Sequence, residues 1–378
     1  MVPEGWKDST LGEMVRLQRG YDLPAPERID GDFPIVGGGG PNGSHRVAKV
    51  DGPGIVIGRS GAGIGNAWWV QGPFWPLNTG LFVTEFLGND PRFCFYWLDN
   101  YDFSSFNTGG AQPSLNRNFI YPIPAPLPPL PEQRKIAEIL STWDRAIEKT
   151  EALLAAAKAQ KRALMQTLLT GKRRFPEFEG QRWREVRLGS LCEVNPRLST
   201  IANDDRLTFL SMDAVSEEGR ILRRDEGSTG QYGAGYTRFQ DGDVLVAKIT
   251  PCFENGKGCH ASGLVNGVGA GSTEFHVLRA RDERDQRFLF QVVNSHPFRA
   301  RGEANMQGSA GQRRVPTDFI RAYPVYAPER AEERARIAEV LDEADAMAEE
   351  HKAQIEKLRT EKSALMQQLL TGKRRVRA

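Results

Sequence analysis

Apolar residues recur along residues 132–170 with alternating spacings of four and three. The positions in this series are Ile136, Leu140, Trp143, Ile147, Thr150, Leu154, Ala157, Lys161, Leu164 and Leu168, of which Thr150 and Lys161 are polar. This spacing is typical of the seam along which two helices form a coiled coil. Pro131 precedes the segment and Gly171 follows it, and these residue types start and stop helices. The pattern predicts one helix of about 38 residues, roughly 55–60 Å long.

A second segment repeats the first at an offset of 201 residues. ALMQTLLTGKRR at 163–174 recurs as ALMQQLLTGKRR at 364–375, with 11 of 12 positions identical. The same seam then falls on Ile337, Leu341, Ala344, Ala348, His351, Ile355, Leu358, Lys362, Leu365 and Leu369, and Gly372 ends the segment. Because so long an amphipathic helix is not stable alone, we expect the two copies to pack against each other.

Two polar features of these helices have two interpretations each. Lys161 and Lys362 occupy equivalent seam positions. The favoured interpretation is that their stems cover apolar surface while the ammonium groups reach water. The alternative is that they fix the register or orientation of the helices. The Gly-Lys-Arg-Arg clusters after both helices could contact phosphates or balance the charge of the helix C-termini.

The segments before the two helices also correspond, more loosely. Trp6 and Leu11-Gly12 match Trp183 and Leu188-Gly189 near their starts. Near their ends the matching pairs are Gln112 with Gln312, Leu115 with Val315, and Phe119-Ile120 with Phe319-Ile320. The lengths between these landmarks differ, as in duplicated domains whose interiors have diverged. We therefore predict a globular domain at 1–130, a helix at 131–175, a second globular domain at 176–330 and a second helix at 331–378.

Both globular segments contain short apolar runs bounded by turn residues. Ile55–Ile57 and Val244–Val246 are typical of strands, and Phe93–Leu98 and Arg287–Asn294 of short helices. The predicted fold class is α+β, with two duplicated strand-rich domains separated by two long antiparallel coiled-coil helices.

Composition narrows the class of protein and its cellular compartment, but it does not identify the function. The chain has 39% hydrophobic and 26% charged residues, which is typical of a soluble globular protein. It contains no apolar run long enough for a membrane span, and its polar first residues do not resemble a signal peptide. Four scattered cysteines (Cys94, Cys192, Cys252 and Cys259) do not form a disulfide framework, so we expect a cytoplasmic protein. The net charge of +2 neither indicates nor excludes DNA binding. It suits a protein that recognises DNA while partner proteins supply part of the contact with it.

The sequence offers little that could carry catalysis. Glycines at 61–65 follow a predicted strand, as in a nucleotide or S-adenosylmethionine loop. However, Asn66–Val70 is typical of another strand, so a tight hairpin that displays Arg59 and Ser60 is favoured. Cys252, Cys259 and His260 lack the spacing of a zinc site, and we expect inert thiols and no metal. No nucleophile–base or acidic cluster is evident, which favours binding over catalysis.

Polar and basic residues on the predicted loops are the candidates for DNA contact. Arg and Lys suit guanine, while Asn and Gln suit adenine in the major groove. The candidates are Asn42, His45, Arg46, Arg59, Ser60, Gln112, Asn116 and Arg117 in the first domain, and Lys248, Lys257, Thr273, Gln312, Arg313 and Arg314 in the second. For any one of them, a solvated loop residue is an equal alternative.

Several of these motifs resemble the specificity subunits of type I restriction–modification systems. Residues 127–140 (LPPLPEQRKIAEIL) and 168–172 (LLTGK) are similar to the start and end of that family's central helix. Residues 110–115 and 311–315 resemble edges of its target-recognition domains. One departure is 327–334 (APERAEER), where the usual Pro-Leu-Pro-x-Gln-Arg start is lost. The departure weakens any partner contact assigned to that end, but not the architecture.

The resemblance implies a non-catalytic subunit that reads a bipartite target in double-stranded DNA. Each domain would read one half-site, and the helix pair would set the spacer. Two modification (methyltransferase) subunits would dock on the helices, and restriction (motor-nuclease) subunits would join them. S-adenosylmethionine, ATP and Mg would be held by these partners and not by this chain; no membrane is involved.

Three alternatives remain open at this point. The chain could be the specificity subunit of a type IIB-like system, in which one partner both methylates and cleaves. It could be a coiled-coil scaffold that binds proteins. It could be an enzyme that uses the loop at 61–65, which predicts that the isolated chain binds S-adenosylmethionine.

Overall fold

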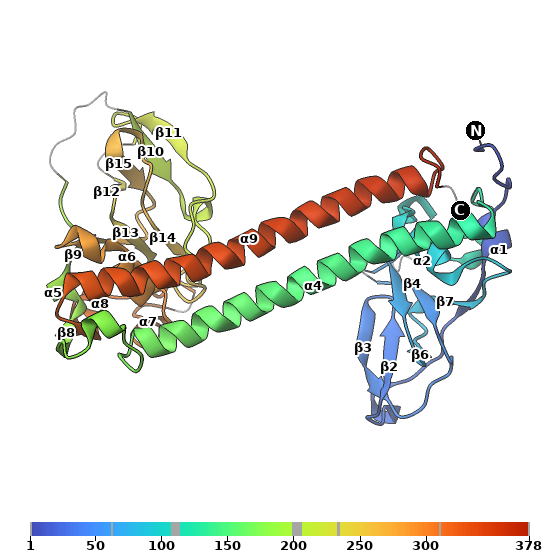
Figure 1. Cartoon of the computed structure of the whole chain (residues 1–378), viewed down its shortest axis with the longest axis horizontal. Helices are drawn as coiled ribbons and strands as arrows, with labels where there is room; N and C mark the ends of the chain where they lie inside the picture. The colour runs from blue at the N-terminus through green and yellow to red at the C-terminus, as the bar shows by residue number, and fades with distance from the viewer. Residues whose placement is uncertain are drawn as a thin grey trace. The chain divides into compact units, whose positions relative to one another are not determined.

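A computed structural model describes residues 2–61, 63–106, 114–198, 206–232, 235–309 and 311–376. The chain forms two compact units, Met1–Ala152 with His351–Ala378 (unit 1) and Leu153–Glu350 (unit 2). Each unit therefore combines one strand-rich segment with half of each long helix; the elements are labelled in Figure 1. Among the described residues, no helix combines the length and apolar content needed to cross a membrane.

Both long helices are present, and they end in the same way. α4 spans Leu130–Leu168 and α9 spans Ala331–Leu369, with 39 residues each. After α4, Gly171 has a φ of +68° and the Arg173 amide donates to the Thr167 carbonyl at 3.1 Å. After α9, Gly372 has the same φ, and Arg374 donates to Gln368 at 3.1 Å. A glycine in the left-handed region closes each helix, as the sequence predicts.

The central sheet of each unit has the same strand order. In unit 1 the order is β1-β7-β4-β5, and in unit 2 it is β9-β16-β13-β14, with every neighbouring pair antiparallel. The strands span Arg16–Arg19 (β1), Gly80–Glu85 (β7), Gly54–Gly58 (β4), Ala67–Val70 (β5), Cys192–Val194 (β9), Phe275–Ala280 (β16), Val244–Ala247 (β13) and Gly258–His260 (β14). Every residue of β4 and β13 is buried, which explains their continuous apolar runs.

A second sheet in each unit also follows a shared plan. Unit 1 has β3-β2-β6 and unit 2 has β11-β10-β15-β12, with β2 parallel to β6 and β10 parallel to β15. The strands span Phe33–Gly37 (β2), Gly40–His45 (β3), Trp75–Pro76 (β6), Arg206–Leu210 (β10), Asp225–Ser228 (β11), Thr237–Gln240 (β12) and Val268–Gly271 (β15). β12 adds a strand in unit 2, the unit with the longer interior. The internal repeat thus extends from the helices to the sheets.

Short helices complete the two units. α2 and α6 confirm the helices predicted near residues 93 and 287, and both pack beside the buried strands of their central sheets. The short helices span Leu11–Met14 (α1), Pro91–Asn100 (α2), Arg117–Ile120 (α3), Leu188–Leu191 (α5), Gln286–Val293 (α6), His296–Ala304 (α7) and Thr317–Ala322 (α8). In unit 2, β8 (Trp183–Arg187) pairs with β17 (Pro324–Pro328), which leads into α9. The mixed helix and strand content agrees with the predicted fold class.

Within each unit the two helix halves run antiparallel. In unit 1, Glu132 pairs with Arg375 just beyond α9, and Asp144 pairs with Lys362, so numbers rise along α4 as they fall along α9. Unit 2 repeats the pattern with Lys161–Asp345 and Arg174–Glu333. The seam side chains predicted from the spacing are all buried or half-buried.

The favoured interpretation of the two seam lysines is wrong. Each ammonium group is held by a carboxylate: Lys161 Nζ lies 2.5 Å from an Asp345 carboxylate oxygen, and Lys362 Nζ lies 2.6 Å from one of Asp144. Only 19% and 16% of the two lysine side chains are exposed. The aspartates lie on the neighbouring helix, so attraction between opposite charges outweighs hydration of the ammonium groups.

A buried glutamate in the first turn of each long helix binds an arginine from the segment that follows the other long helix. In unit 1, Arg375 donates through Nε and Nη2 to Glu132, at 2.9 Å each, and the Trp6 indole donates at 3.2 Å. Arg375 holds the pKa of Glu132 below its usual range. The Arg–carboxylate contact is bidentate, which is the strongest geometry for such a pair.

Unit 2 repeats this contact with the equivalent residues. Arg174 donates to Glu333 at 3.0 and 2.8 Å, and Trp183 donates to it at 3.0 Å. The last arginine of each Gly-Lys-Arg-Arg cluster has a partner that neither interpretation named. Arg174 and Arg375 each meet the glutamate at the start of the other long helix, and 41% of the Arg375 side chain remains exposed.

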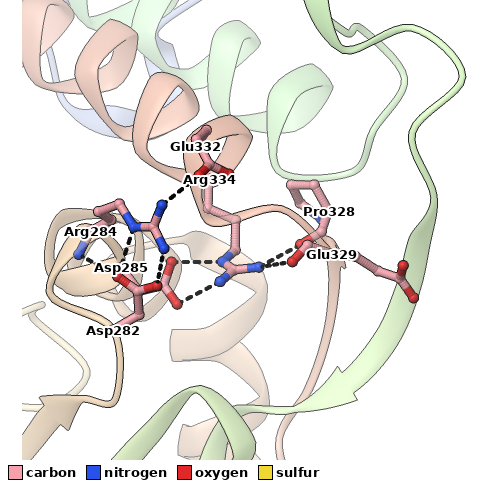
Figure 2. A network of polar contacts seen from close by, with 7 residues as sticks. All are labelled: Asp282, Arg284, Asp285, Pro328, Glu329, Glu332 and Arg334. Atoms are coloured by element: carbon pink, nitrogen blue, oxygen red, sulfur yellow. Dashed lines mark hydrogen bonds and ion pairs between the residues drawn. The ribbon is translucent and has the colours of Figure 1, made fainter.

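The unusual sequence at 327–334 has a structural explanation in unit 2. Arg334 donates to both carboxylate oxygens of Asp285, at 2.7 and 2.8 Å, and to the carbonyls of Pro328 and Glu329 (Figure 2). In unit 1 the equivalent residue is Gln133, which bonds to the Pro128 carbonyl, Asn89 and the Asp90 amide. Arginine replaces glutamine there because an aspartate faces it, and the helix start is preserved.

Glu333→Gln should destabilise unit 2 by about 3 kcal/mol, because it leaves Arg174 half-buried without a counter-charge. Glu333 is fully buried, whereas Glu339 forms an exposed pair with Arg336. Glu339→Gln is therefore the matched control and should cost under about 1 kcal/mol. Chemical unfolding of both variants measures the difference. Equal losses would show that the buried pair contributes nothing special.

Candidate nucleic-acid interface

In unit 1, basic and amide side chains meet where β4 leaves the central sheet. Arg59 and Ser60 follow β4 directly, and the Leu115 amide donates to the Arg59 carbonyl at 2.8 Å. This contact brings the start of α3 to the end of β4. An open pocket of about 590 Å³ lies there, lined in part by Gln18, Arg19, Arg59, Asn116 and Arg117.

The charge of this pocket is positive. Three arginines and one carboxylate, Asp22, line it. Arg19 pairs with Asp22 at 3.1 Å, while Arg59 and Arg117 donate to backbone carbonyls at 3.3 and 2.8 Å. These carbonyls orient the two guanidinium groups without neutralising them. The Asn116 side chain caps α3 by accepting from the Asn118 amide at 3.0 Å.

Unit 2 has the same backbone arrangement after β13. The Val315 amide donates to the Lys248 carbonyl at 2.8 Å, just as Leu115 donates to Arg59. Lys248 is thus the structural counterpart of Arg59, although no sequence motif aligns them. The segment that carries Gln312, Arg313 and Arg314 is held beside Lys248 by this contact.

Acidic residues balance part of the charge in unit 2. Arg314 pairs with Glu274 at 2.9 Å, and Arg313 lies 3.6 Å from Glu254. The hydrogen bonds from Arg314, together with the charge of Lys248, hold the pKa of Glu274 below its usual range. The two arginines are thereby oriented, and among the described residues Lys248 forms no salt bridge of its own. The site therefore combines Lys248 with two arginines, Arg313 and Arg314, that lie beside carboxylates.

Other predicted contact residues lie elsewhere. Asn42 and Arg46 are exposed on and after β3, in the second sheet of unit 1. Thr273 is exposed just before β16. The Lys257 ammonium donates to the Met212 carbonyl at 3.0 Å, so it is engaged within the chain. Gln112 lies outside the described residues.

The expectation that His45 is displayed on a loop is wrong. Its ring is buried, its Nδ1 accepts from the Ile29 amide at 3.1 Å, and it packs edge-on against Trp75. His45 is the last residue of β3, and its contacts with Ile29 and Trp75 hold it inside unit 1.

Sequence reasoning missed several arginines. Arg19 lies beside Arg59 at the end of β1, and strand alternation could not have indicated its exposure, because it places Arg19 on the face of the buried Leu17. In unit 2, Arg187, Arg197, Arg281 and Arg321 line an open pocket of about 770 Å³ with Glu193. They come from segments far apart in the sequence, so no local pattern indicates them.

The glycine-rich loop is a tight hairpin, as predicted. The Gly65 amide donates to the Gly58 carbonyl at 2.9 Å, and β5 follows at Ala67. A Cβ at Gly58 would lie 1.7 Å from the Gly63 carbonyl oxygen, and one at Gly63 would lie 2.0 Å from that of Gly38. These glycines allow backbones to pack closely, which accounts for them without a bound cofactor.

Contacts within unit 2 account for Cys259 and His260, two of the residues considered above as metal ligands. Cys259 is buried in β14, and burial raises the pKa of its thiol to about 12. The neighbouring His260 ring contacts Gln286 at 3.4 Å. Among the ranges that the structure describes, no three His, Cys, Asp or Glu side chains are grouped as metal ligands would be.

Known proteins resemble the chain in sequence and in fold. Residues 3–159 match the family described as "Type I restriction modification DNA specificity domain". The type I restriction enzyme EcoEI specificity subunit of Escherichia coli is 34% identical over 213 residues, 56% of this chain and 35% of that protein. The MjaVIII specificity subunit of Methanocaldococcus jannaschii is 22% identical over 100% of this chain and 94% of that protein. The crystal structure of the type I system S subunit from M. genitalium has the same fold, with a TM-score of 0.64 at 12% identity, covering 97% of this chain and 96% of that one.

The type I restriction–modification specificity subunits are thus the proteins that this chain resembles in sequence and in fold. The family match covers residues 3–159, which is less than half of the chain. The resemblance predicted from the repeated helix motif is thereby confirmed. The chain spans about a third of the length of the EcoEI and EcoAI specificity subunits.

Acid should destabilise unit 2 through His276. The ring is buried, donating from Nε2 to the Val315 carbonyl at 2.9 Å, and burial lowers its pKa. The unfolded chain therefore takes up the proton first, and stability present above the ordinary histidine pKa of about 6.5 is lost as the pH falls below it.

His276→Gln should reduce the stability lost between pH 7.5 and pH 5.5, measured as the change in urea midpoint. His296 is exposed at the start of α7, so His296→Gln is the matched control and should respond as the unsubstituted protein does. An unchanged pH response of His276→Gln would contradict the assignment.

Proposed function

We propose that this chain reads a bipartite sequence in double-stranded DNA, one half-site per globular domain, and has no catalytic role of its own. The observation that carries the proposal is the duplicated position of a cation after the buried central strand. Arg59 occupies it in unit 1 and Lys248 in unit 2, each held by one backbone hydrogen bond from the segment before α3 or α8. A rigid sheet thus presents a positive side chain in both units.

The chemistry of these two sites suits base reading. Arg59 lies beside the exposed Asn116, and Lys248 lies beside Gln312, Arg313 and Arg314. Arg and Lys donate to guanine O6 and N7, whereas Asn and Gln can both donate to and accept from adenine. Asn116 already uses its side-chain oxygen for α3, so its amide nitrogen is the group left for DNA. Different side chains at equivalent positions are what reading two different half-sites requires.

The helices provide the spacer and the docking surface in this proposal. The chain divides into recognition domains at 1–130 and 176–330, with antiparallel coiled-coil helices at 131–175 and 331–378 fixing the distance between half-sites. Two modification subunits dock on the helices and restriction subunits join them. S-adenosylmethionine, ATP and Mg act in those partners. Support comes from the matched family and from relatives whose names describe them as specificity subunits of restriction enzymes.

Arg59→Ala and Lys248→Ala should each weaken recognition at a single, different half-site. Losing one base contact costs about 1–3 kcal/mol at that half-site and relaxes its sequence preference. The sequence preference at each half-site is measured by binding to DNA libraries that are randomised in one half-site at a time. The protein is assayed as its complex with the modification subunit. The half-site that stays unchanged is the internal control. Equal weakening at both half-sites, or at neither, would count against one reader per domain.

A further inference from the structure

Each seam lysine joins three parts of its unit through one aspartate. In unit 1, Asp144 of α4 binds Lys362 of α9 at 2.6 Å and accepts from the Tyr96 hydroxyl of α2 at 2.5 Å. Tyr96 also contacts the Ser141 hydroxyl at 3.1 Å, and the Lys362 ammonium lies 5.3 Å from the centre of its ring. The two long helices and the globular part thus meet at a single carboxylate.

Unit 2 builds the same junction from a different side chain. Asp345 of α9 binds Lys161 of α4 at 2.5 Å and accepts from Gln291 of α6 at 3.1 Å. Gln291 also donates to Asp342 at 2.7 Å. Positions 342 and 345 are the repeats of 141 and 144 at the offset of 201. Tyrosine and glutamine therefore perform the same bridging task in the two units.

The sequence around Lys161 opposes a change of helix register. In the observed register Lys161 faces Asp345. A coiled-coil seam tolerates slips of one heptad, since apolar positions then still meet. Such a slip of α9 brings either Lys352 or Ala338 opposite Lys161. The first places two ammonium groups together, and the second leaves one without a counter-charge.

The same two slips of α9 also change the residue that faces Lys362. It faces Asp144 in the observed register, and Glu151 or Ala137 after a slip of one heptad. The slip that pairs it with Glu151 is the one that sets Lys161 against Lys352. The opposite slip deprives both lysines of a partner at once. Only the observed register satisfies both seam charges.

We propose that the Lys161–Asp345 and Lys362–Asp144 pairs are positioning elements that fix the register of α4 against α9 and, through Gln291 and Tyr96, hold each globular part to that register. This inference rests on the proposed function for its consequence, which is that these pairs determine the spacer length that the protein accepts. Nearby exposed pairs do not share the role. Arg359–Glu151 joins the helices in unit 1, yet its side chains are 53% and 47% exposed.

The test reverses the lysine charges and then restores pairing. Lys161→Asp with Lys362→Asp creates two like-charge contacts, and adding Asp345→Lys with Asp144→Lys recreates opposite pairs. Spin labels on cysteines at the exposed positions Ala163 and Glu343, in a Cys252→Ser background, report the register of unit 2 without DNA. A heptad slip moves the labels along the helix axis by about 10 Å. The complex with its modification subunit is assayed in parallel on DNA with spacers of graded length.

The like-charge variant should shift or broaden the label distance and reduce spacer discrimination at least roughly tenfold. The four-residue swap should restore both readings. Arg359→Glu, the same reversal in the exposed pair, should change neither. A folded like-charge variant with both readings unchanged would overturn the proposal. If that variant does not fold, Asp144→Asn with Asp345→Asn decides, because an unchanged label distance there also overturns it.

The two proposals fail in distinguishable ways. If the unsubstituted complex shows no preference for a bipartite target, the proposed function fails, while the label distances still decide whether the lysines set the register. If half-sites are read correctly but the spacer preference ignores the charge reversal, the register proposal fails and the proposed function stands.

Discussion

The buried glutamate in the first turn of each long helix is the interaction on which both units depend. Glu132 and Glu333 each accept two hydrogen bonds from an arginine and one from a tryptophan. The arginine follows the other long helix, and the tryptophan opens the strand-rich segment. One carboxylate therefore ties three stretches of chain that are far apart in sequence. A carboxylate so deeply buried is stable only with all these donors present, which makes the contact cooperative.

The two units keep this framework while changing the residues that support it. Gln133 faces backbone groups and Asn89 in unit 1, whereas Arg334 faces Asp285 in unit 2. Similarly, Tyr96 and Gln291 reach equivalent aspartates from equivalent helices. Each replacement is compensated locally, because a buried donor must find an acceptor wherever it lies. Geometry is conserved between the halves even where side chains differ.

Residues at the ends of the central strands are free to differ for another reason. Arg59 and Lys248 are positioned through their backbone, since the hydrogen bonds from Leu115 and Val315 reach a carbonyl and not a side chain. A scaffold held by main-chain contacts can exchange the side chain it presents without losing its shape. That arrangement suits a protein whose two halves read different sequences.

The sequence alone determined the long helices, their ends, the buried strands and the duplication, because those features depend on local periodicity and on a repeat visible at one offset. It also placed Arg59, Asn116 and Arg117 among the candidates that the structure brings together. Only the tertiary structure decided which charges pair. Lys161 and Lys362 looked solvated, and His45 looked displayed, because the partners that bury them come from distant segments. Glu132 and Arg375 lie 243 residues apart, and no local pattern joins them. Long-range electrostatic pairing depends on how the chain folds back on itself, and that information exists only in three dimensions.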